Sequence, residues 1–182
     1  MEKPLGWIGI TLLVLWLVQI VDAALPADFA QYGLYPRSLA GLLGIFTMPF
    51  LHGGFGHLLG NSVSLGILLA LLATSQPNAK WLAVLTAIGS GCVLWLVGRS
   101  ANHIGASGLI FGLVGLLVCT GYFDRRPVPI IVALAVGILF GTTVLYGLMP
   151  GAEGVSWDGH ASGLVAGVAV AFAHAKWNKR PF

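Results

Sequence analysis

The side chains in this sequence best suited to chemistry are Ser107, His160, His57 and Asn61. A serine hydroxyl becomes a nucleophile when a neighbouring base takes its proton, and histidine is the base most often used near neutral pH. His57 and Asn61 are four residues apart, so on a helix they share one face. From there both can donate hydrogen bonds toward one point, as a developing oxyanion requires. The four residue types together are those of a nucleophilic acyl-transfer site.

Ser107 also has a purely structural interpretation. It lies in the run Gly105-Ala106-Ser107-Gly108, which continues with Gly112 and Gly115 at helical spacing. Small residues repeated in this way are typical of close helix contacts in membranes, and a serine there can bond back to its own helix. Taken alone, the run favours packing over catalysis.

The other polar residues have structural alternatives too. His160 shares a helix face with Gly163 and Gly167, so it points along a groove that admits a close neighbour. It is either a reactive group, a histidine bonded to a backbone carbonyl, or a proton-relay group of a transporter. His57 and Asn61 are either oxyanion donors or a polar clamp between helices.

The composition places these residues in a membrane protein. Of the 182 residues, 57% are apolar and only 8% are charged, whereas a soluble domain carries about 25% charged residues. The nine Lys and Arg residues form no basic patch, so no nucleic-acid partner is expected. Cys92 and Cys119 lie in apolar runs and indicate no disulfide framework.

The charged residues divide the chain into six apolar runs, each close to the roughly 20 residues that a membrane-spanning helix needs. We therefore predict an all-α polytopic bundle in one domain over residues 1–182, with an N-terminal span that is retained rather than cleaved. The predicted spans are 5–24, 57–74, 81–98, 104–122, 128–148 and 157–175.

The topology follows from the positively charged residues. Seven of the nine Lys and Arg residues fall on one side of the predicted spans, and only Arg37 and Arg99 on the other. Because cytoplasmic loops are enriched in Lys and Arg, both termini are expected in the cytoplasm. The long first loop then lies outside, and its apolar stretch 39–46 predicts a segment in the membrane interface.

This topology places the candidate residues at one depth. The second, fourth and sixth predicted spans all begin on the outer side, where His57, Asn61, Ser107 and His160 occur. Polar residues inside spans are costly and are functional candidates by default. Their convergence near the outer surface is the strongest physical signal in the sequence.

Four further polar residues are assigned lesser roles. His52 precedes His57 in a glycine-rich stretch and is interpreted as a residue that anchors the loop. His103, Asp158 and His174 are interpreted as interfacial residues, although His103 lies four residues before Ser107 and could serve as its base.

In combination, these motifs resemble those of the rhomboid intramembrane serine proteases. The run His52–Asn61, spaced His-x4-His-x3-Asn, is similar to the second-helix motif of that family. Gly105–Gly108 is similar to its fourth-helix nucleophile motif, and Gly159–Gly167 to its sixth-helix motif. With six spans and an interfacial first loop, the resemblance extends over nearly the whole chain.

The resemblance implies a serine endopeptidase that hydrolyses peptide bonds in or near transmembrane segments of membrane-protein substrates. Ser107 would be the nucleophile and His160 the general base and acid, with His57 and Asn61 in the oxyanion hole. The supporting residues would be His52, Gly105, Gly108, Phe111 and Gly163. No cofactor is implied, and no metal, because the histidines lack a coordinating set of carboxylates or thiolates.

The expected partners are transmembrane protein substrates and the lipid bilayer, and the short tails favour a prokaryotic cytoplasmic membrane. One departure concerns the first loop: many rhomboids carry a Trp-Arg pair there, where this chain has Gly41-Leu42-Leu43-Gly44. Two alternatives remain open. They are a non-catalytic rhomboid-like protein that binds transmembrane helices, and a small proton-coupled transporter.

Overall fold

The computed structural model describes residues 4–151 and 154–178, and the regular structure in these ranges consists of helices with one isolated β-bridge. The long helices are α1 (Pro4–Ala24), α3 (Phe55–Ser75), α4 (Ala79–Val97), α5 (Ser107–Asp124), α6 (Pro127–Gly147) and α7 (Trp157–Asn178). The predicted all-α polytopic bundle is confirmed. The start of α5 differs from the predicted span by three residues, because the chain approaches Ser107 through Gly105 in a positive-φ conformation.

Among the described residues, five helices are long and apolar enough to cross a membrane, namely α1, α3, α4, α5 and α6. The segment predicted as the sixth span forms α7, whose 22 residues reach about 33 Å at 1.5 Å per residue. It is not among the five because Asp158, His160 and His174 lower its mean hydropathy. The contacts of α7 with α5 and α4 cover part of this more polar helix.

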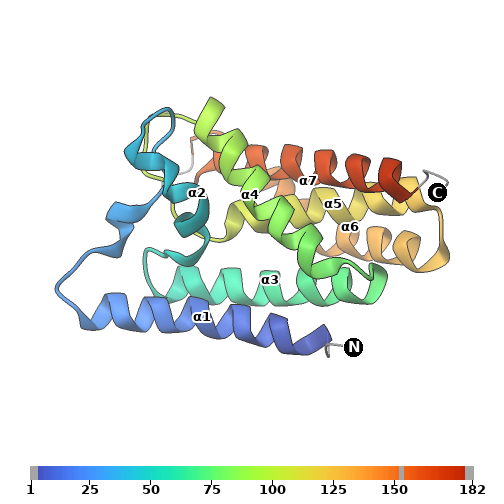
Figure 1. Cartoon of the computed structure of the whole chain (residues 1–182), viewed down its shortest axis with the longest axis horizontal. Coiled ribbons are helices and arrows are strands. Elements are labelled where there is room, and N and C mark those ends of the chain that lie inside the picture. The colour runs from blue at the N-terminus through green and yellow to red at the C-terminus, as the bar shows by residue number, and fades with distance from the viewer. Residues whose placement is uncertain (1–3, 152–153, 179–182) are drawn as a thin grey trace.

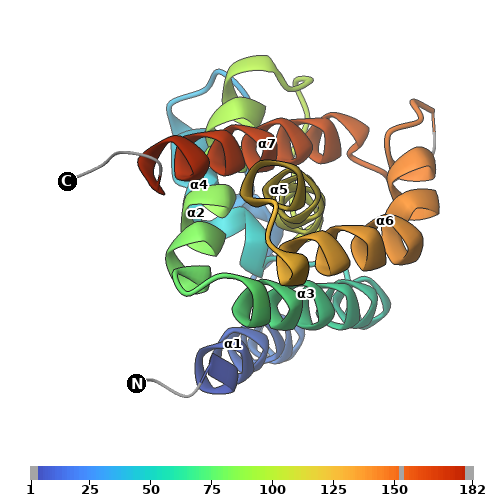
Figure 2. The same ribbon diagram turned by 90° about the vertical axis from the view of Figure 1, so that its right-hand side faces the viewer.

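Helix α5 forms the centre of the bundle. It is seen nearly end-on in Figure 2, surrounded by α7, α6, α3 and α4. In the apolar stretch of α5, 61% of the residues are buried, compared with 17% in α1 and 22% in α6. Helices α3, α5 and α7 all begin at the end of the bundle that carries the first loop (Figure 1). The N-terminal turns that hold the candidate residues therefore lie at one end of the molecule.

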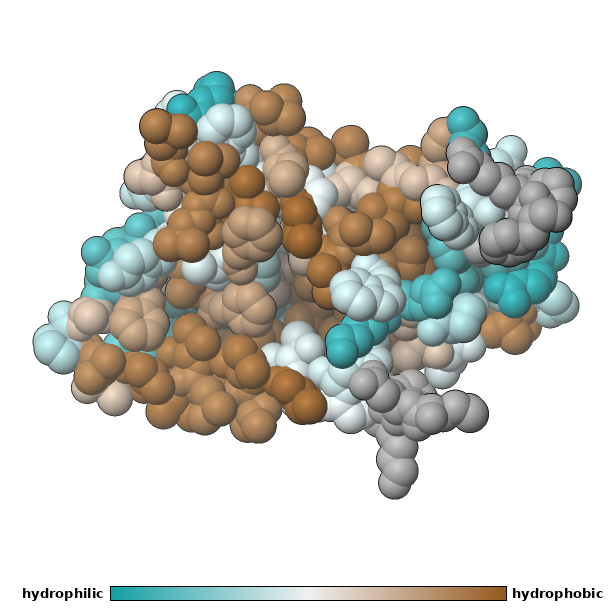
Figure 3. All heavy atoms as spheres, viewed as in Figure 1, coloured by the Kyte–Doolittle hydropathy of each residue, from teal (hydrophilic) through white to brown (hydrophobic). Residues whose placement is uncertain are grey.

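The first loop folds into four short helical segments rather than an extended strand. They are η1 (Phe29–Tyr32), η2 (Ala40–Leu42), α2 (Gly44–Thr47) and η3 (Met48–Phe50). Leu39, Leu43 and Phe46 are exposed, whereas Ile45 and Met48 are buried against the bundle. This distribution of exposed apolar side chains is what an interfacial segment requires. Hydrophobic residues cover the middle of the face seen in Figure 3, and hydrophilic ones gather toward its ends.

Arg37 and Trp95 attach this loop to α4. The Arg37 guanidinium donates to the carbonyls of Gly98 at 2.7 Å and Leu96 at 3.4 Å, which α4 leaves unpaired at its C-terminus. The Trp95 indole N–H donates back to the Ser38 carbonyl at 2.9 Å. A tryptophan and an arginine thus hold the loop even though they are not adjacent in sequence.

Candidate active site

The candidate residues occupy the first turns of three helices. Ser107 is the first residue of α5, and His160 lies in the first turn of α7; both are half-buried. His57 lies in the first turn of α3 and is exposed. Asn61 lies one turn later on α3 and is only 7% exposed. The sequence placed these residues at one depth, and the structure places them at one end of the bundle.

The imidazole of His160 is held by two contacts. Its ring stacks on Phe111, with ring centroids 4.1 Å apart and planes 5° from parallel. Its Nδ1 lies 2.8 Å from the carbonyl oxygen of Gly147, at the end of α6. Because a carbonyl only accepts hydrogen bonds, Nδ1 carries the hydrogen and the neutral ring keeps Nε2 as its proton acceptor.

Phe111 also connects His160 to Ser107. The two α5 residues are four positions apart and therefore lie on the same helix face. Since Phe111 stacks on His160, that face of α5 is the one turned toward the histidine. The family resemblance implied a supporting role for Phe111, and its ring is the one that stacks on His160.

Glycines allow α5 and α7 to approach closely, as their spacing predicted. A Cβ atom on Gly163 would overlap the carbonyl oxygen of Gly108, and one on Gly167 would overlap that of Gly112. The two backbones are thus in direct contact along the run of small residues. The packing interpretation of these glycines is correct, and it is the same contact that brings the two helices of Ser107 and His160 together.

The segment before Ser107 lies against His57 and Asn61. Gly105 has φ 110°, and a Cβ atom there would be 2.8 Å from Cε1 of His57 and 3.5 Å from Nδ2 of Asn61. Its backbone N–H donates to the Met48 carbonyl at 2.9 Å, which ties it to the first loop. The Asn61 Nδ2 is buried and donates to no acceptor among the described residues. Two donor side chains therefore lie beside the backbone that leads to the serine.

His52 packs against this group from the loop side. Its ring is buried and lies edge-on to His57, with centroids 5.1 Å apart. Burial, together with the nearby His57, lowers the pKa of His52 to about 4. This ring is therefore neutral at physiological pH.

His103 and Asp158 lie where the chain enters α5 and α7, and both side chains are buried inside the protein, 3% and 6% exposed. Both ring nitrogens of His103 are engaged, Nδ1 at 2.7 Å from the Ser156 hydroxyl and Nε2 at 3.1 Å from the Arg99 carbonyl. His103 is thus not available as the base of Ser107. His174 lies at the opposite end, 3.3 Å from the Gln76 side-chain oxygen.

Sequence reasoning missed Gly147 and Ser156. Gly147 acts through its backbone carbonyl, for which no side-chain type gives a signal. Ser156 precedes α7 and caps it, and a Ser located three residues before Gly159 could have been recognised as a helix N-cap. Within the described residues no three histidine, cysteine or carboxylate side chains gather as a metal site would require.

Comparisons with known proteins give a consistent family. The model of the Rhomboid domain matches residues 40–177. An uncharacterized protein of Mycobacterium tuberculosis is 36% identical, over 87% of this chain and 70% of the relative. An uncharacterized protein of Mycobacterium leprae is 34% identical, over 94% of this chain and 74% of the relative. Rhomboid-like protease 5 of Toxoplasma gondii is 32% identical over 84% of this chain, which spans 19% of that protein.

Proposed function

Because this chain belongs to the rhomboid family and is an integral multi-pass membrane protein, we propose that it is an intramembrane serine endopeptidase. Its substrates are membrane proteins cleaved in or near their transmembrane segments. Ser107 is the nucleophile and His160 the general base and acid, and neither metal nor cofactor takes part.

The orientation of His160 carries this proposal. Stacking on Phe111 and the Gly147 carbonyl at Nδ1 hold the ring in one tautomer, with Nε2 able to accept a proton. In a serine triad an aspartate does this orienting work. Here a carbonyl and an aromatic face replace the carboxylate, which supports a dyad.

The reaction then follows ordinary acyl transfer. Ser107 Oγ attacks the scissile carbonyl carbon while His160 takes the hydroxyl proton, so that a tetrahedral oxyanion forms. His160 returns the proton to the leaving amine as the C–N bond breaks, leaving an acyl-enzyme on Ser107. Water then attacks the ester, again with His160 as base, and Ser107 is released.

The oxyanion of this reaction needs hydrogen-bond donors that already face its position. We assign this role to His57, to the Nδ2 of Asn61 and to the backbone N–H of Ser107. The buried Nδ2 without an acceptor among the described residues supports the assignment of Asn61. Losing one such donor typically costs about 10²–10³-fold in rate.

The distribution of Lys and Arg supports a topology with both termini in the cytoplasm and the site toward the outer surface. A position near the outer rim gives water access to the acyl-enzyme. A substrate peptide bond must leave its helix before attack, since in lipid all backbone groups are otherwise paired.

Cleavage of a transmembrane substrate in proteoliposomes tests the proposal. Wild-type protein should cut a single-span substrate with helix-destabilising residues near its outer end, and Ser107→Ala and His160→Ala should each abolish cleavage. A fluorophosphonate probe should label wild type but not Ser107→Ala. Cleavage retained in Ser107→Ala would disprove the dyad.

Matched variants separate catalysis from folding. Ser64→Ala, on α3, and His174→Ala, at the opposite end of the bundle, should retain activity. A non-catalytic protein that binds transmembrane helices is the alternative. It would capture the substrate without cutting it and would leave the fluorophosphonate unreacted.

A further inference from the structure

A cluster of polar side chains outside the candidate dyad, two of them buried, joins the segment before α5 to the start of α7. We call this cluster the outer network and define it by four residues, Arg99, His103, Ser156 and Asp158. Arg99 and His103 lie in the loop that leads into α5, and Ser156 and Asp158 lie at the start of α7. The proposed chemistry uses none of the four.

The contacts within the outer network are short and cross between the two segments. Asp158 accepts from the Arg99 backbone N–H at 2.7 Å and from its guanidinium at 3.1 Å. His103 lies 2.7 Å from the Ser156 hydroxyl through Nδ1 and 3.1 Å from the Arg99 carbonyl through Nε2. The Ser156 hydroxyl also donates to Oδ1 of Asp158 at 3.3 Å, so Ser156 contacts both buried residues.

On the α7 side, the outer network continues directly into the backbone of His160. The Ser156 carbonyl accepts from the His160 N–H at 2.9 Å, and the Ser156 hydroxyl accepts from the Gly159 N–H at 3.2 Å. Ser156 thus caps α7 while its side chain reaches across to His103. A shift of Ser156 would move the first turn of the helix that carries His160.

On the α5 side, the outer network precedes Ser107 by four residues. His103 also exchanges two backbone hydrogen bonds of 2.9 Å with Leu34 of the first loop. Between His103 and Ser107 lies Gly105, whose position is fixed against His57. The loop has little freedom once His103 is held at one end and Gly105 at the other.

The energetics favour a positional role over a stabilising one. The Asp158 side chain is 7% exposed and that of Arg99 is 52% exposed, so the pair is largely desolvated on the carboxylate side only. Buried ion pairs rarely stabilise a fold more than apolar residues of the same size would, although breaking one is costly. What the outer network provides is a defined spacing between two helix starts.

We propose that the outer network is a positioning device that sets the distance between Ser107 and His160. This inference rests on the proposed function. It makes Ser156 and Asp158 positioning residues, since neither touches the reacting atoms. Removing the hydrogen bonds between the two segments should leave a folded protein. In part of its population, however, Ser107 and His160 should be too far apart to react.

Ser156→Ala is the main test, because it removes one hydroxyl and no charge, and Ser156→Thr is its conservative partner. In proteoliposomes, kcat of Ser156→Ala should fall about 10–100-fold while KM stays within about twofold of wild type. The rate of fluorophosphonate labelling of Ser107 should fall in parallel, and Ser156→Thr should restore both. Ser64→Ala, on α3 and outside the outer network, is the matched control.

Asp158→Asn should act in the same direction, with Asp28→Asn in the first loop as its control. If Asp158→Asn does not fold, Ser156→Ala carries the test alone. A purely structural role for the helix cap predicts a different result: a lower melting temperature with unchanged kcat for the folded enzyme. That result would overturn the proposal.

A measurement without activity separates this inference from the proposed function. Spin labels at Ala101→Cys and Val165→Cys, with the native Cys92 and Cys119 replaced by alanine, report the distance between the loop before α5 and helix α7. Ser156→Ala should broaden this distance distribution, and an unchanged distribution would overturn the inference. Failure of wild type to cleave any substrate would refute the proposed function but not the broadening.

Discussion

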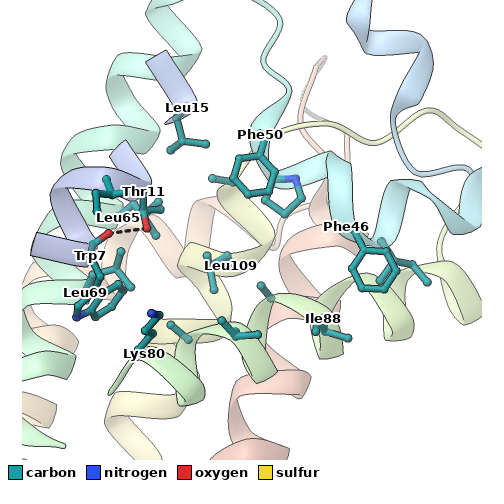
Figure 4. Close-up of a pocket in the computed structure, with 17 residues that line it drawn as sticks. Trp7, Thr11, Leu15, Phe46, Phe50, Leu65, Leu69, Lys80, Ile88 and Leu109 are labelled. Atoms are coloured by element: carbon teal, nitrogen blue, oxygen red, sulfur yellow. Dashed lines mark hydrogen bonds between the residues drawn. The ribbon is translucent and has the colours of Figure 1, made fainter. Parts of the chain in front are cut away.

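The α5–α7 contact and the space between α1 and α4 show opposite kinds of packing in one small bundle. Between α5 and α7, glycines bring two backbones together so closely that no Cβ atom fits on Gly163 or Gly167. Between α1 and α4 lies an apolar cavity of about 480 Å³ beneath the first loop. It appears as a hollow in Figure 3 and is drawn in Figure 4, where residues of α1, α3, α4 and α5 line it.

The difference follows from the solvent. In lipid no hydrophobic force closes a gap between helices, because lipid tails are as apolar as leucine. Lys80 is the one charged residue among those that line the cavity. Few hydrogen bonds or ion pairs can therefore form between its walls. The α5–α7 contact is tight because the sequence places small residues there. The tight contact joins the two helices that carry Ser107 and His160.

The largest expected effect comes from breaking the α5–α7 contact. Gly163→Ala drives a Cβ atom into the Gly108 carbonyl, a backbone atom that cannot move aside. Overpacking of this kind costs about 1–3 kcal/mol, and more where the neighbour is rigid. We expect loss of cleavage and a sharply lower melting temperature in detergent. Gly137→Ala, on α6 with open space around it, is the control, and equal stability of the two variants would refute the contact's importance.

The next effect targets His160 rather than the helix contact. Gly147→Ala places a Cβ atom against the Phe111 ring and 3.0 Å from Nδ1 of His160. The ring must shift, and a displacement of about 1 Å can cost 10²-fold in rate. We therefore expect kcat to fall about that much, with a smaller loss of stability than for Gly163→Ala. Gly141→Ala, with open space around it, should leave kcat unchanged. A normal kcat in Gly147→Ala would show that the position of the His160 ring does not limit the reaction.

The cavity between α1 and α4 should tolerate a larger side chain, whereas the α5–α7 contact should not. Ala87→Leu adds a side chain at a residue that lines the cavity. Cavity filling commonly adds about 0.5–2 kcal/mol of stability, so unfolding in detergent should show an unchanged or raised stability with normal cleavage. Strong destabilisation would mean that the walls are rigid, and the contrast between the two regions would fail.

The smallest effect concerns pH at the junction of the first loop and α3. The pKa of His52 is lowered from 6.5 to about 4 by burial and by His57. Between about pH 6.5 and pH 4, His52 is protonated in the unfolded chain but neutral in the folded protein. The free energy of unfolding therefore decreases as the pH is lowered through this range. His52→Gln should lose less melting temperature than wild type between pH 7.5 and 5. An equal loss would show that His52 does not contribute.

Much of the fold was predictable because periodic apolar runs are local signals. The helix containing Ser107 was expected and found, as was the glycine face of α5. Asp158 and His174 already made the sequence of α7 more polar than that of the other helices. The prediction of six spans nevertheless counted α7 as a span like the others. The hydrogen bonds of His103 were not predictable, because its partners, Ser156 and Arg99, lie in two different segments.

By itself, the sequence determined a polytopic helical membrane protein and predicted a serine, two histidines and an asparagine at one depth, because hydropathy and charge act residue by residue along the chain. Only the tertiary structure decided how His160 is held, how the first loop is attached through Arg37 and Trp95, and that His103 is structural. Those contacts join backbone carbonyls and side chains far apart in the chain, and no local pattern specifies which of them will meet.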